Sequence, residues 1–298
     1  MSIDSAQVPS VQPMPWTRNA LGRLGKCLVR GEDIPEGLPN YDDVMLWYND
    51  LTGFLHHRVE SVDLTPILPD LIPEISSRTK TVDTLTEKLI RHPTYQLPNI
   101  QDISGARLEC DMTLKQQTNV ANALAAALAD VAEVEIKDYR TEAHSGYRAV
   151  HLWLTFTELK ARAEVQIRTH LQAAWANAYE QAADRFGRDI RYGAFPEEEP
   201  GRAIVELLQQ MSTDSVAEIE SLQESVAESL ERLKAAKMPR AFKGGPDKRQ
   251  VRRHKRRMGL LRVDMEDTAL HVYALKKENA RRLLLIKDAL KVLRAEGE

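Results

Sequence analysis

The sequence predicts an α+β fold, in which a half-buried sheet is flanked by helices and further helices lie toward both ends of the chain. Apolar and polar residues alternate in three segments, which is typical of strands with one buried face. Apolar residues recur at helical spacing in several others, which predicts amphipathic helices. The strand-like segments are residues 105–111, 148–156 and 160–168, and the helical ones are residues 41–60, 84–91, 114–130, 170–186 and 202–237.

The N-terminal part reads as a loose segment followed by one long helix. Residues 1–40 carry many prolines and glycines and are expected to be flexible, with a short helix around Asn19–Val29. One apolar stripe then predicts a helix from Tyr41 to about residue 60. The stripe consists of Val44, Trp47, Leu51, Phe54 and Leu55. After it, three prolines between residues 66 and 73 break the chain into short pieces.

The predicted sheet has an uncommon polar face. In residues 105–111 the apolar side chains share one face, while Arg107 and Glu109 lie on the other. The segments 148–156 and 160–168 repeat this alternation and predict a hairpin. Their polar face is dense in Arg, Glu, His and Gln, whereas a solvated sheet usually carries Thr, Ser and Lys. This face is therefore the candidate functional surface.

Composition excludes several classes of protein. The 298 residues carry 41 Lys+Arg against 44 Asp+Glu, a net charge of −3, and 43% are hydrophobic, which is ordinary for a folded chain. No apolar run approaches the ~18 residues of a membrane span, and the N-terminus lacks the pattern of a signal peptide. Cys27 and Cys110 are too few for a disulfide framework. We expect a cytoplasmic protein with no membrane partner.

Several cations and two carboxylates are expected on or beside the polar face. Arg and Lys neutralise phosphates, and two carboxylates from different strands can hold Mg²⁺, so the set suits a polyphosphate bound with a divalent metal. The residues are Arg78, Lys80, Lys88, Asp102, Arg107, Tyr147, His151 and Glu164.

Each of these residues also has an ordinary structural interpretation. Arg78 and Lys80 can lie on a solvated edge, and Asp102 can cap the turn before Gly105. Glu164 can pair with a neighbouring arginine, and His151 can be a common sheet residue. Charge-rich sheet faces do occur without catalysis, so the pattern alone leaves both interpretations open.

The order and spacing of these residues resemble the synthetase domain of the RelA/SpoT family. The resemblance covers roughly residues 75–195, about two fifths of the chain, and the pairing of GYRAVH with EVQIRT one strand later is specific. The matching segments are Arg78-Thr-Lys80, Lys88, Asp102-Ile-Ser-Gly105-Ala-Arg107, Asp138-Tyr139, Gly146-Tyr147-Arg148-Ala-Val-His151, Glu164-Val-Gln166-Ile-Arg168-Thr169 and Trp175-Ala176.

The resemblance implies a fold and a reaction. The fold is nucleotidyltransferase-like, a mixed sheet with flanking helices. The reaction moves the β,γ-pyrophosphate of ATP onto a 3′-hydroxyl, usually that of GDP or GTP, which makes (p)ppGpp in the stringent response. Carried over, Arg78, Lys80, Lys88 and Arg107 bind ATP, and Asp102 and Glu164 bind Mg²⁺ and are the catalytic residues. Tyr147, His151 and Gln166 bind the acceptor, and Glu164 assists its deprotonation.

Two departures concern the acceptor side. Ala143-His144 stands where many family members have Pro-Lys, so a titrating His144 replaces a fixed cation that would meet acceptor phosphate. Ala173 stands where some small synthetases carry an Asn that contacts guanine, and the loss of that side chain weakens base discrimination. ATP as donor is therefore the firmer expectation, and the acceptor stays open.

The expected organisation is that of a small synthetase without a hydrolase domain, because the paired His56-His57 lack the adjacent Asp of the family's hydrolase motif. The expected segments are a flexible residues 1–40, a synthetase domain at 41–195 with its motif core at 75–195, a helical region at 196–238, a basic linker at 239–258 and a segment at 259–298 that ends in a helix.

Residues 240–257 form a basic segment, with nine Lys and Arg residues against Asp247 alone, a net charge of +8. It is either a solvated linker or a contact for an RNA backbone. The candidate RNA-binding residues are Arg249, Arg252, Arg253, Lys255, Arg256 and Arg257.

Three functions thus stay open: an alarmone synthetase, a toxin that pyrophosphorylates the 3′ CCA end of tRNA or makes adenosine alarmones, and a silent nucleotide-binding module. A homo-oligomer formed through the C-terminal helices and an antitoxin partner are further expectations from the resemblance.

Overall fold

The computed structural model describes residues 10–141, 143–236 and 248–295. The chain divides into two compact units. The first comprises Met1–Met112, Gln116–Thr141 and Ala149–Thr169. The second comprises Thr113–Lys115, Glu142–Arg148 and His170–Glu298.

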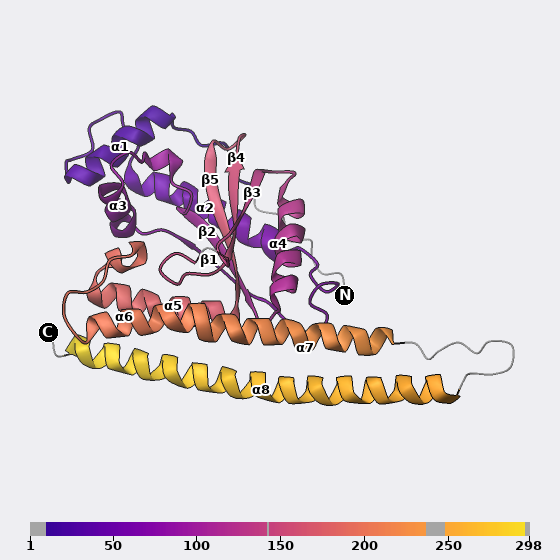
Figure 1. The fold of residues 1–298 in the computed structure, drawn as a ribbon. Helices are drawn as coiled ribbons and strands as arrows, with labels where there is room; N and C mark the ends of the chain where they lie inside the picture. Colours follow the sequence, from indigo (N-terminus) through magenta and orange to yellow (C-terminus); the bar gives the residue numbers. More distant parts are fainter. Residues whose placement is uncertain (1–9, 142, 237–247, 296–298) are drawn as a thin grey trace, which may run out of the picture. The chain divides into compact units, whose positions relative to one another are not determined.

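The first unit contains a five-stranded mixed sheet with the order β1-β2-β5-β4-β3 (Figure 1). β2 and β5 are parallel, and the other three pairs are antiparallel, including the predicted β4–β5 hairpin. The expected α+β fold with a mixed sheet is thus confirmed. The strands are β1 (Glu74–Thr79), β2 (Ser104–Cys110), β3 (Glu133–Asp138), β4 (Val150–Phe156) and β5 (Ala161–Thr169).

The two edge strands, β1 and β3, were not expected. β1 has the sequence EISSRT, whose single large apolar residue gives no alternating pattern, and it follows the three prolines. β3 is short and mostly exposed. Both form because each pairs along its whole length with a well-patterned neighbour, β2 or β4.

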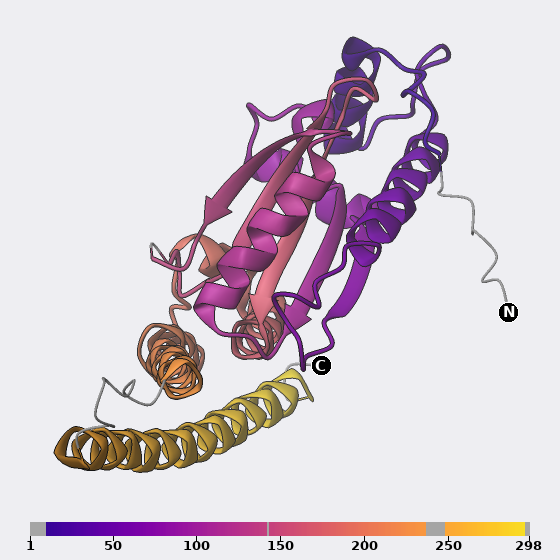
Figure 2. The ribbon, with the colours of Figure 1, turned by 90° about the vertical axis from the view of Figure 1, so that its right-hand side faces the viewer.

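Four helices belong mainly to the first unit, and they cover the apolar face of the sheet or flank it. Figure 2 shows α4 lying over one face of the sheet. α2 packs against β1 and β2, and its buried residues join those of the sheet in one apolar core. The helices are α1 (Arg18–Arg30), α2 (Tyr41–Glu60), α3 (Val82–Arg91) and α4 (Leu114–Leu128), with one 3₁₀ turn at Leu97–Asn99.

Local capping explains where α1 and α2 begin. The hydroxyl of Thr17 accepts a hydrogen bond from the amide of Ala20 at 3.2 Å, and the side chain of Asn40 accepts one from the amide of Asp42 at 3.0 Å. Much of the segment expected to be flexible is therefore ordered around α1, while residues 1–9 lie outside the described residues.

The second unit is helical and packs around its own apolar cluster, which includes Trp175 and Tyr179 of α5 and Leu283, Ile286 and Leu290 of α8. Figure 1 shows α7 and α8 running side by side, and they are in contact. The elements are α5 (His170–Phe186), a 3₁₀ turn (Arg188–Tyr192), α6 (Gly201–Gln210), a π-helical turn (Met211–Val216), α7 (Ala217–Ala235) and α8 (Lys248–Ala295).

The basic linker expected at residues 239–258 is wrong from Lys248 onward, because those residues begin the 48-residue helix α8. Residues 237–247 lie outside the described residues. The physical reason is that Arg and Lys both have good helix propensity, so a basic segment can continue a helix as readily as it can form a linker. The grouping also differs from the expected boundary at residue 195, since α5 belongs with the C-terminal helices.

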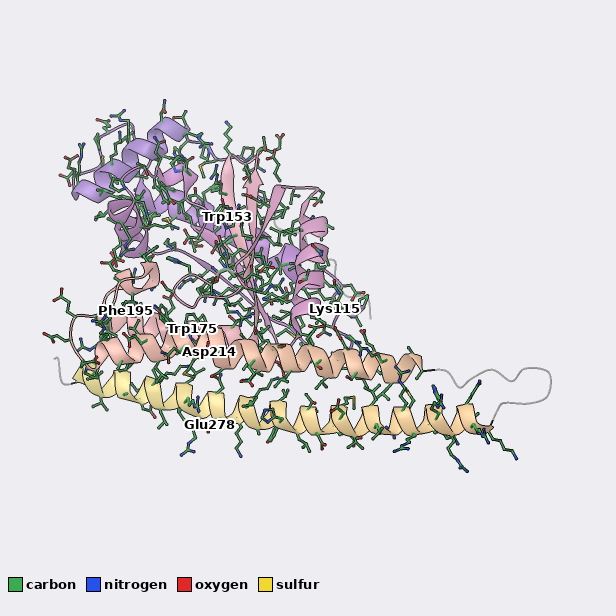
Figure 3. All side chains as sticks on the ribbon, viewed as in Figure 1. Lys115, Trp153, Trp175, Phe195, Asp214 and Glu278 are labelled. Carbon is green, nitrogen blue, oxygen red and sulfur yellow. The ribbon has the colours of Figure 1, made fainter. Side chains whose placement is uncertain are left out.

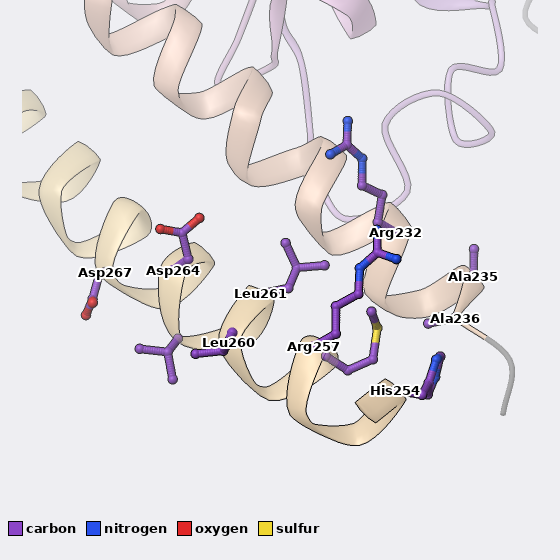
Figure 4. Close-up of a pocket in the computed structure, with 11 residues that line it drawn as sticks. Arg232, Ala235, Ala236, His254, Arg257, Leu260, Leu261, Asp264 and Asp267 are labelled. Carbon is purple, nitrogen blue, oxygen red and sulfur yellow. The ribbon is translucent and has the colours of Figure 1, made fainter. Parts of the chain in front are cut away.

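A groove of about 880 Å³ lies between the end of α7 and the start of α8 (Figure 4). Arg232 of α7 and Arg257, Leu260 and Leu261 of α8 line it.

Within the described part of the chain, no helix is both long and apolar enough to cross a bilayer.

Candidate functional site

Most of the residues expected to bind ATP lie together in one cleft of the first unit. The cleft has a volume of about 140 Å³ and lies on the polar face of β1, β2 and β5. Its lining residues are Ser76, Ser77, Arg78, Lys80, Asp102, Gly105, Ala106, Arg107, Glu164 and Gln166. We call it the donor cleft.

Strand register explains why these side chains meet. Gly105 of β2 lies opposite Arg78 of β1 on one side and opposite Glu164 of β5 on the other. On this face of the sheet, β1 therefore presents the cation of Arg78 and β5 presents the carboxylate of Glu164. Between them, β2 presents no side chain, because its residue is Gly105. Glycine at position 105 leaves the space between Arg78 and Glu164 open.

Asp102 is held by two lysines. Its Oδ2 accepts a hydrogen bond from Lys80 Nζ at 2.8 Å, and its Oδ1 accepts one from Lys88 Nζ at 2.6 Å. Burial alone would raise the pKa of Asp102, but the charges and hydrogen bonds of the two lysines outweigh it and lower the pKa to about 2. Asp102 is thus ionised at neutral pH and brings two cations to one side of the cleft.

Glu164 is a buried carboxylate with three polar neighbours. Its Oε2 lies 3.6 Å from His151 Nδ1, and its Oε1 accepts a hydrogen bond from Gln166 Nε2. Burial opposes ionisation, but the hydrogen bonds and charge of His151, together with Gln166, lower the pKa of Glu164. The negative charge of Asp102 opposes this shift. A lowered pKa keeps Glu164 ionised at neutral pH, as both a cation ligand and a proton acceptor must be.

Arg168 and Tyr139 lie outside the predicted site and hold two of its residues in place. Arg168 contacts Gln166, and Tyr139 contacts His151. The amide oxygen of Gln166 accepts hydrogen bonds from Arg107 Nε at 3.3 Å and from Arg168, so its amide nitrogen faces Glu164. The ring of Tyr139 meets that of His151 edge-on, with the centroids 5.0 Å apart. Both residues stand in the matching sequence segments, but those segments do not reveal their contacts.

The donor set fits Mg²⁺. Asp102 and Glu164 supply carboxylate oxygens to one cleft, and Mg²⁺ commonly takes one or two carboxylates, with phosphate oxygens and waters as its other ligands. Nowhere in the described ranges do three or more His, Cys, Asp or Glu residues gather closely enough to hold a metal by themselves. The cleft therefore fits a cation that arrives with a phosphorylated ligand.

Tyr147 and His144 belong to the second unit, in a short loop at residues 143–148. The amide of Tyr147 donates to the carbonyl of His144 at 2.9 Å, and Ser145 and Gly146 both have positive φ. A Cβ at Gly146 would lie 2.8 Å from the ring of Trp175 and 3.2 Å from Gln209 Cα. Only glycine fits this close approach without displacing its neighbours.

The same loop is held from the other side by the C-terminal helices of its unit. Arg148 Nη1 lies 2.8 Å from Glu220 Oε2 of α7, and the other oxygen of Glu220 accepts a hydrogen bond from Gln172 at 2.8 Å. Ser212, within the π-helical turn, donates to the carbonyl of Gly146. Arg148 and Glu220 are both buried. We call these contacts the loop clamp.

The remaining predicted residues have simpler surroundings. Ala173 is buried in α5. The candidate RNA-binding residues lie on the first turns of α8 and are exposed, but Arg257 lines the groove beside Arg232. Figure 3 shows side chains projecting outward at this end of α8.

Fold and cleft together define a nucleotidyltransferase-like domain with a cation-lined cleft that holds two carboxylates. Residues 77–185 match the family described as the region found in RelA / SpoT proteins. Two uncharacterized proteins, of Mycobacterium bovis and Mycobacterium tuberculosis, are 41% identical over 210 residues, which cover 70% of this chain and 74% of each relative. The chain belongs to the RelA/SpoT family and carries its synthetase domain.

Solved structures agree on the fold. The small alarmone synthetase 1 of Bacillus subtilis, bound to its product pppGpp, aligns with a TM-score of 0.52 at 20% identity, over 64% of this chain and 98% of that one. A GTP pyrophosphokinase family protein of Streptococcus pneumoniae aligns with a TM-score of 0.50 at 18% identity, over 63% of this chain and 95% of that one.

Proposed function

We propose that this chain transfers pyrophosphate from ATP to the 3′-hydroxyl of a second nucleotide, with GDP or GTP as the leading acceptor and (p)ppGpp as the product. The observation that carries the proposal is the donor cleft, where Asp102, with its two lysines, and Glu164 line one space with Arg78 and Arg107. Family membership and the pppGpp-bound structural neighbour support it.

The donor side uses charge and position. Arg78, Arg107, Lys80 and Lys88 bind the ATP phosphates, and guanidinium groups can do so with two parallel hydrogen bonds. Asp102 and Glu164 would hold Mg²⁺, which neutralises charge on the transferred group when bound. Little covalent participation by the protein is needed in such transfers, because positioning and electrostatic stabilisation supply most of the rate.

In the reaction, the acceptor 3′-oxygen forms a bond to the β-phosphorus of ATP. The bond from that phosphorus to the oxygen bridging it to the α-phosphorus breaks, and AMP leaves with the electron pair. The hydroxyl proton passes toward Glu164 and His151, whose nearest atoms lie 3.6 Å apart. Gln166 keeps Glu164 oriented during this transfer.

The acceptor roles come from the family resemblance alone: it implies that Tyr147 stacks on the acceptor base and that His151, Gln166 and His144 contact acceptor groups. With His144 in place of a lysine and Ala173 in place of an asparagine, we expect weak discrimination among bases. Adenine nucleotides are therefore included as acceptors in the test.

The test is an acceptor screen. Purified full-length protein is incubated with Mg²⁺, ATP labelled in the γ-phosphate, and GDP, GTP, GMP, AMP or total tRNA, and the products are separated. We expect label in a guanosine tetra- or pentaphosphate and none with the E164Q variant. Label in no product at all would overturn the proposal and favour a silent nucleotide-binding module.

A second candidate, pyrophosphorylation of the tRNA 3′ end, is favoured by the start of α8. Arg249, Arg252, Arg253 and Arg256 follow one another at helical spacing, so they share one exposed face, and clustered cations favour a phosphate backbone. Label in tRNA, lost when these four residues are changed to Gln, would choose this function. A toxin role and an antitoxin partner would follow only from that result.

A further inference from the structure

A second cleft of the first unit has the features of an anion site, and Lys88 is its one lining residue that the proposed function uses. Its volume is about 460 Å³, larger than that of the donor cleft. Three cations line it, Arg18, Lys88 and Arg162, and none of its lining residues is acidic. Such convergence of like charges costs free energy unless an anion offsets it.

Two of these cations meet at one neutral residue. Arg18 donates to the side-chain oxygen of Asn99, and Arg162 Nη1 donates to the backbone carbonyl oxygen of Asn99 at 3.4 Å. Within the described residues, no carboxylate forms an ion pair with either guanidinium. Asn99 thus orients the two groups without neutralising them, which leaves their charge available to a bound anion.

The position of Arg18 at the start of α1 also favours an anion in this cleft. Arg18 is the first residue of α1, and the first turn of that helix holds no acidic residue. A cation near the positive end of a helix dipole is unfavourable, so the position favours an anion nearby. Lys88 reaches the same cleft while its Nζ bonds Asp102 at 2.6 Å.

Aromatic rings complete the cleft. Trp153 of β4 is half-buried and lies opposite Glu164 of β5, and Lys137 Nζ lies 4.9 Å from its ring centroid. Figure 3 marks Trp153 on the sheet. Tyr95, which is 48% exposed, supplies a second ring. Cations that bind phosphate beside rings that can stack on a base are the parts of a nucleotide site.

We propose that this cleft binds a nucleotide polyphosphate, with its phosphates on Arg18 and Arg162 and its base against Trp153. The site is separate from the donor cleft, although Lys88 borders it. The proposal goes beyond the proposed function and does not rest on it, because it concerns binding alone.

The experiment is a titration of the full-length protein with GTP, ATP or inorganic pyrophosphate. Binding is measured by the quenching of tryptophan fluorescence. The W153F variant isolates the quench that comes from Trp153. We expect this quench to persist in the donor-cleft variant R78Q/R107Q and to need at least tenfold more nucleotide in R18Q/R162Q. Loss of the quench in R78Q/R107Q, or no weakening in R18Q/R162Q, would overturn the proposal.

Two controls keep the result interpretable. The variant R23Q/K26Q removes the same charge from exposed positions of α1 that do not line the cleft, and it should bind as the wild type does. Circular dichroism and the thermal midpoint verify that each variant is folded. If pyrophosphate binds as tightly as the nucleotides, the assignment to a nucleotide is wrong. Failure of pyrophosphoryl transfer leaves this readout unchanged, because no turnover is measured.

Discussion

The donor cleft and the loop that carries Tyr147 are held in different ways. In the donor cleft, neighbouring strands set the positions, since Arg78, Gly105 and Glu164 lie opposite one another in the sheet. In the loop, by contrast, the backbone bends through positive φ values and depends on the loop clamp, whose residues Ser212 and Glu220 come from much later in the chain.

This difference separates two kinds of precision. A sheet register is specified by many backbone hydrogen bonds, so one changed side chain in the cleft alters charge more than geometry. The loop has few such bonds, so each contact of the loop clamp contributes more to its conformation. Changes in the cleft should therefore affect mainly chemistry, and changes in the loop clamp should affect mainly folding stability and acceptor binding.

The largest expected effect is on catalysis, from Glu164→Gln. The variant keeps the shape of the side chain but removes the charge that would hold Mg²⁺ next to Asp102, so we expect kcat to fall by about 10³-fold. The acceptor screen measures this loss, with Glu158→Gln on the exposed β4–β5 turn as the matched control. Activity within about tenfold of the wild type would remove Glu164 from the machinery.

Next in size is the loop clamp variant Glu220→Ala. It leaves the buried Arg148 without its carboxylate, and losing one partner of a buried ion pair costs about 3 kcal/mol. Urea unfolding should show this loss. The control Glu228→Ala breaks only an exposed pair with Arg232 on the same helix and should cost under about 0.5 kcal/mol. Equal effects of the two would show that the clamp does not hold the loop.

The kinetics of Glu220→Ala test whether the loop and the donor cleft have separate roles. If the clamp positions Tyr147, the KM for the acceptor should rise while the KM for ATP stays near that of the wild type. A rise in the KM for ATP alone would contradict the separation between cleft and loop.

The same contrast explains what could be predicted from the sequence. Alternation of apolar residues predicted β2, β4 and β5 and the polar face, because period two follows directly from strand geometry. The contacts of Asp102 with Lys80 and Lys88, and of Glu164 with His151 and Gln166, were not predicted, although all of these residues stand in the motif segments. The loop clamp could not be predicted, since nothing in the local sequence links Arg148 to Glu220. The length of α8 could not be predicted from charge, because the basic residues at its start have good helix propensity and continue the helix.

Gly146→Ala should have a smaller effect on stability. The new Cβ would need space now occupied by the Trp175 ring at 2.8 Å, and φ is +83°. Gly187→Ala is the matched control in the same unit, because its φ is +97° and nothing lies within 4 Å of the added Cβ. Both variants incur the backbone strain, so the difference between their unfolding free energies, expected at about 2 kcal/mol, measures the close approach to Trp175. No difference would mean that the loop moves away without cost.

The smallest expected effect is the pH dependence that Asp102 confers. Its pKa falls from 3.8 to about 2 on folding, so the folded state gains stability when the group is ionised. That contribution, about 2 kcal/mol, is fully present above about pH 4 and is lost as the pH falls through about 2. Asp102→Asn lacks it, so the gap in unfolding free energy between wild type and variant should narrow as the pH falls from about 5 toward 2.

Lys88→Met tests the cause of that shift. Without Lys88, Lys80 is the remaining lysine that lowers the pKa of Asp102. In the Lys88→Met background, the difference in unfolding free energy between the proteins without and with Asp102→Asn should therefore still narrow as the pH falls, but by less. Urea unfolding at several acidic pH values measures both variants. If the difference in unfolding free energy between the wild type and Asp102→Asn stays constant from about pH 5 to about pH 3, the two lysines do not stabilise the ionised carboxylate, and the electrostatic account of Asp102 fails.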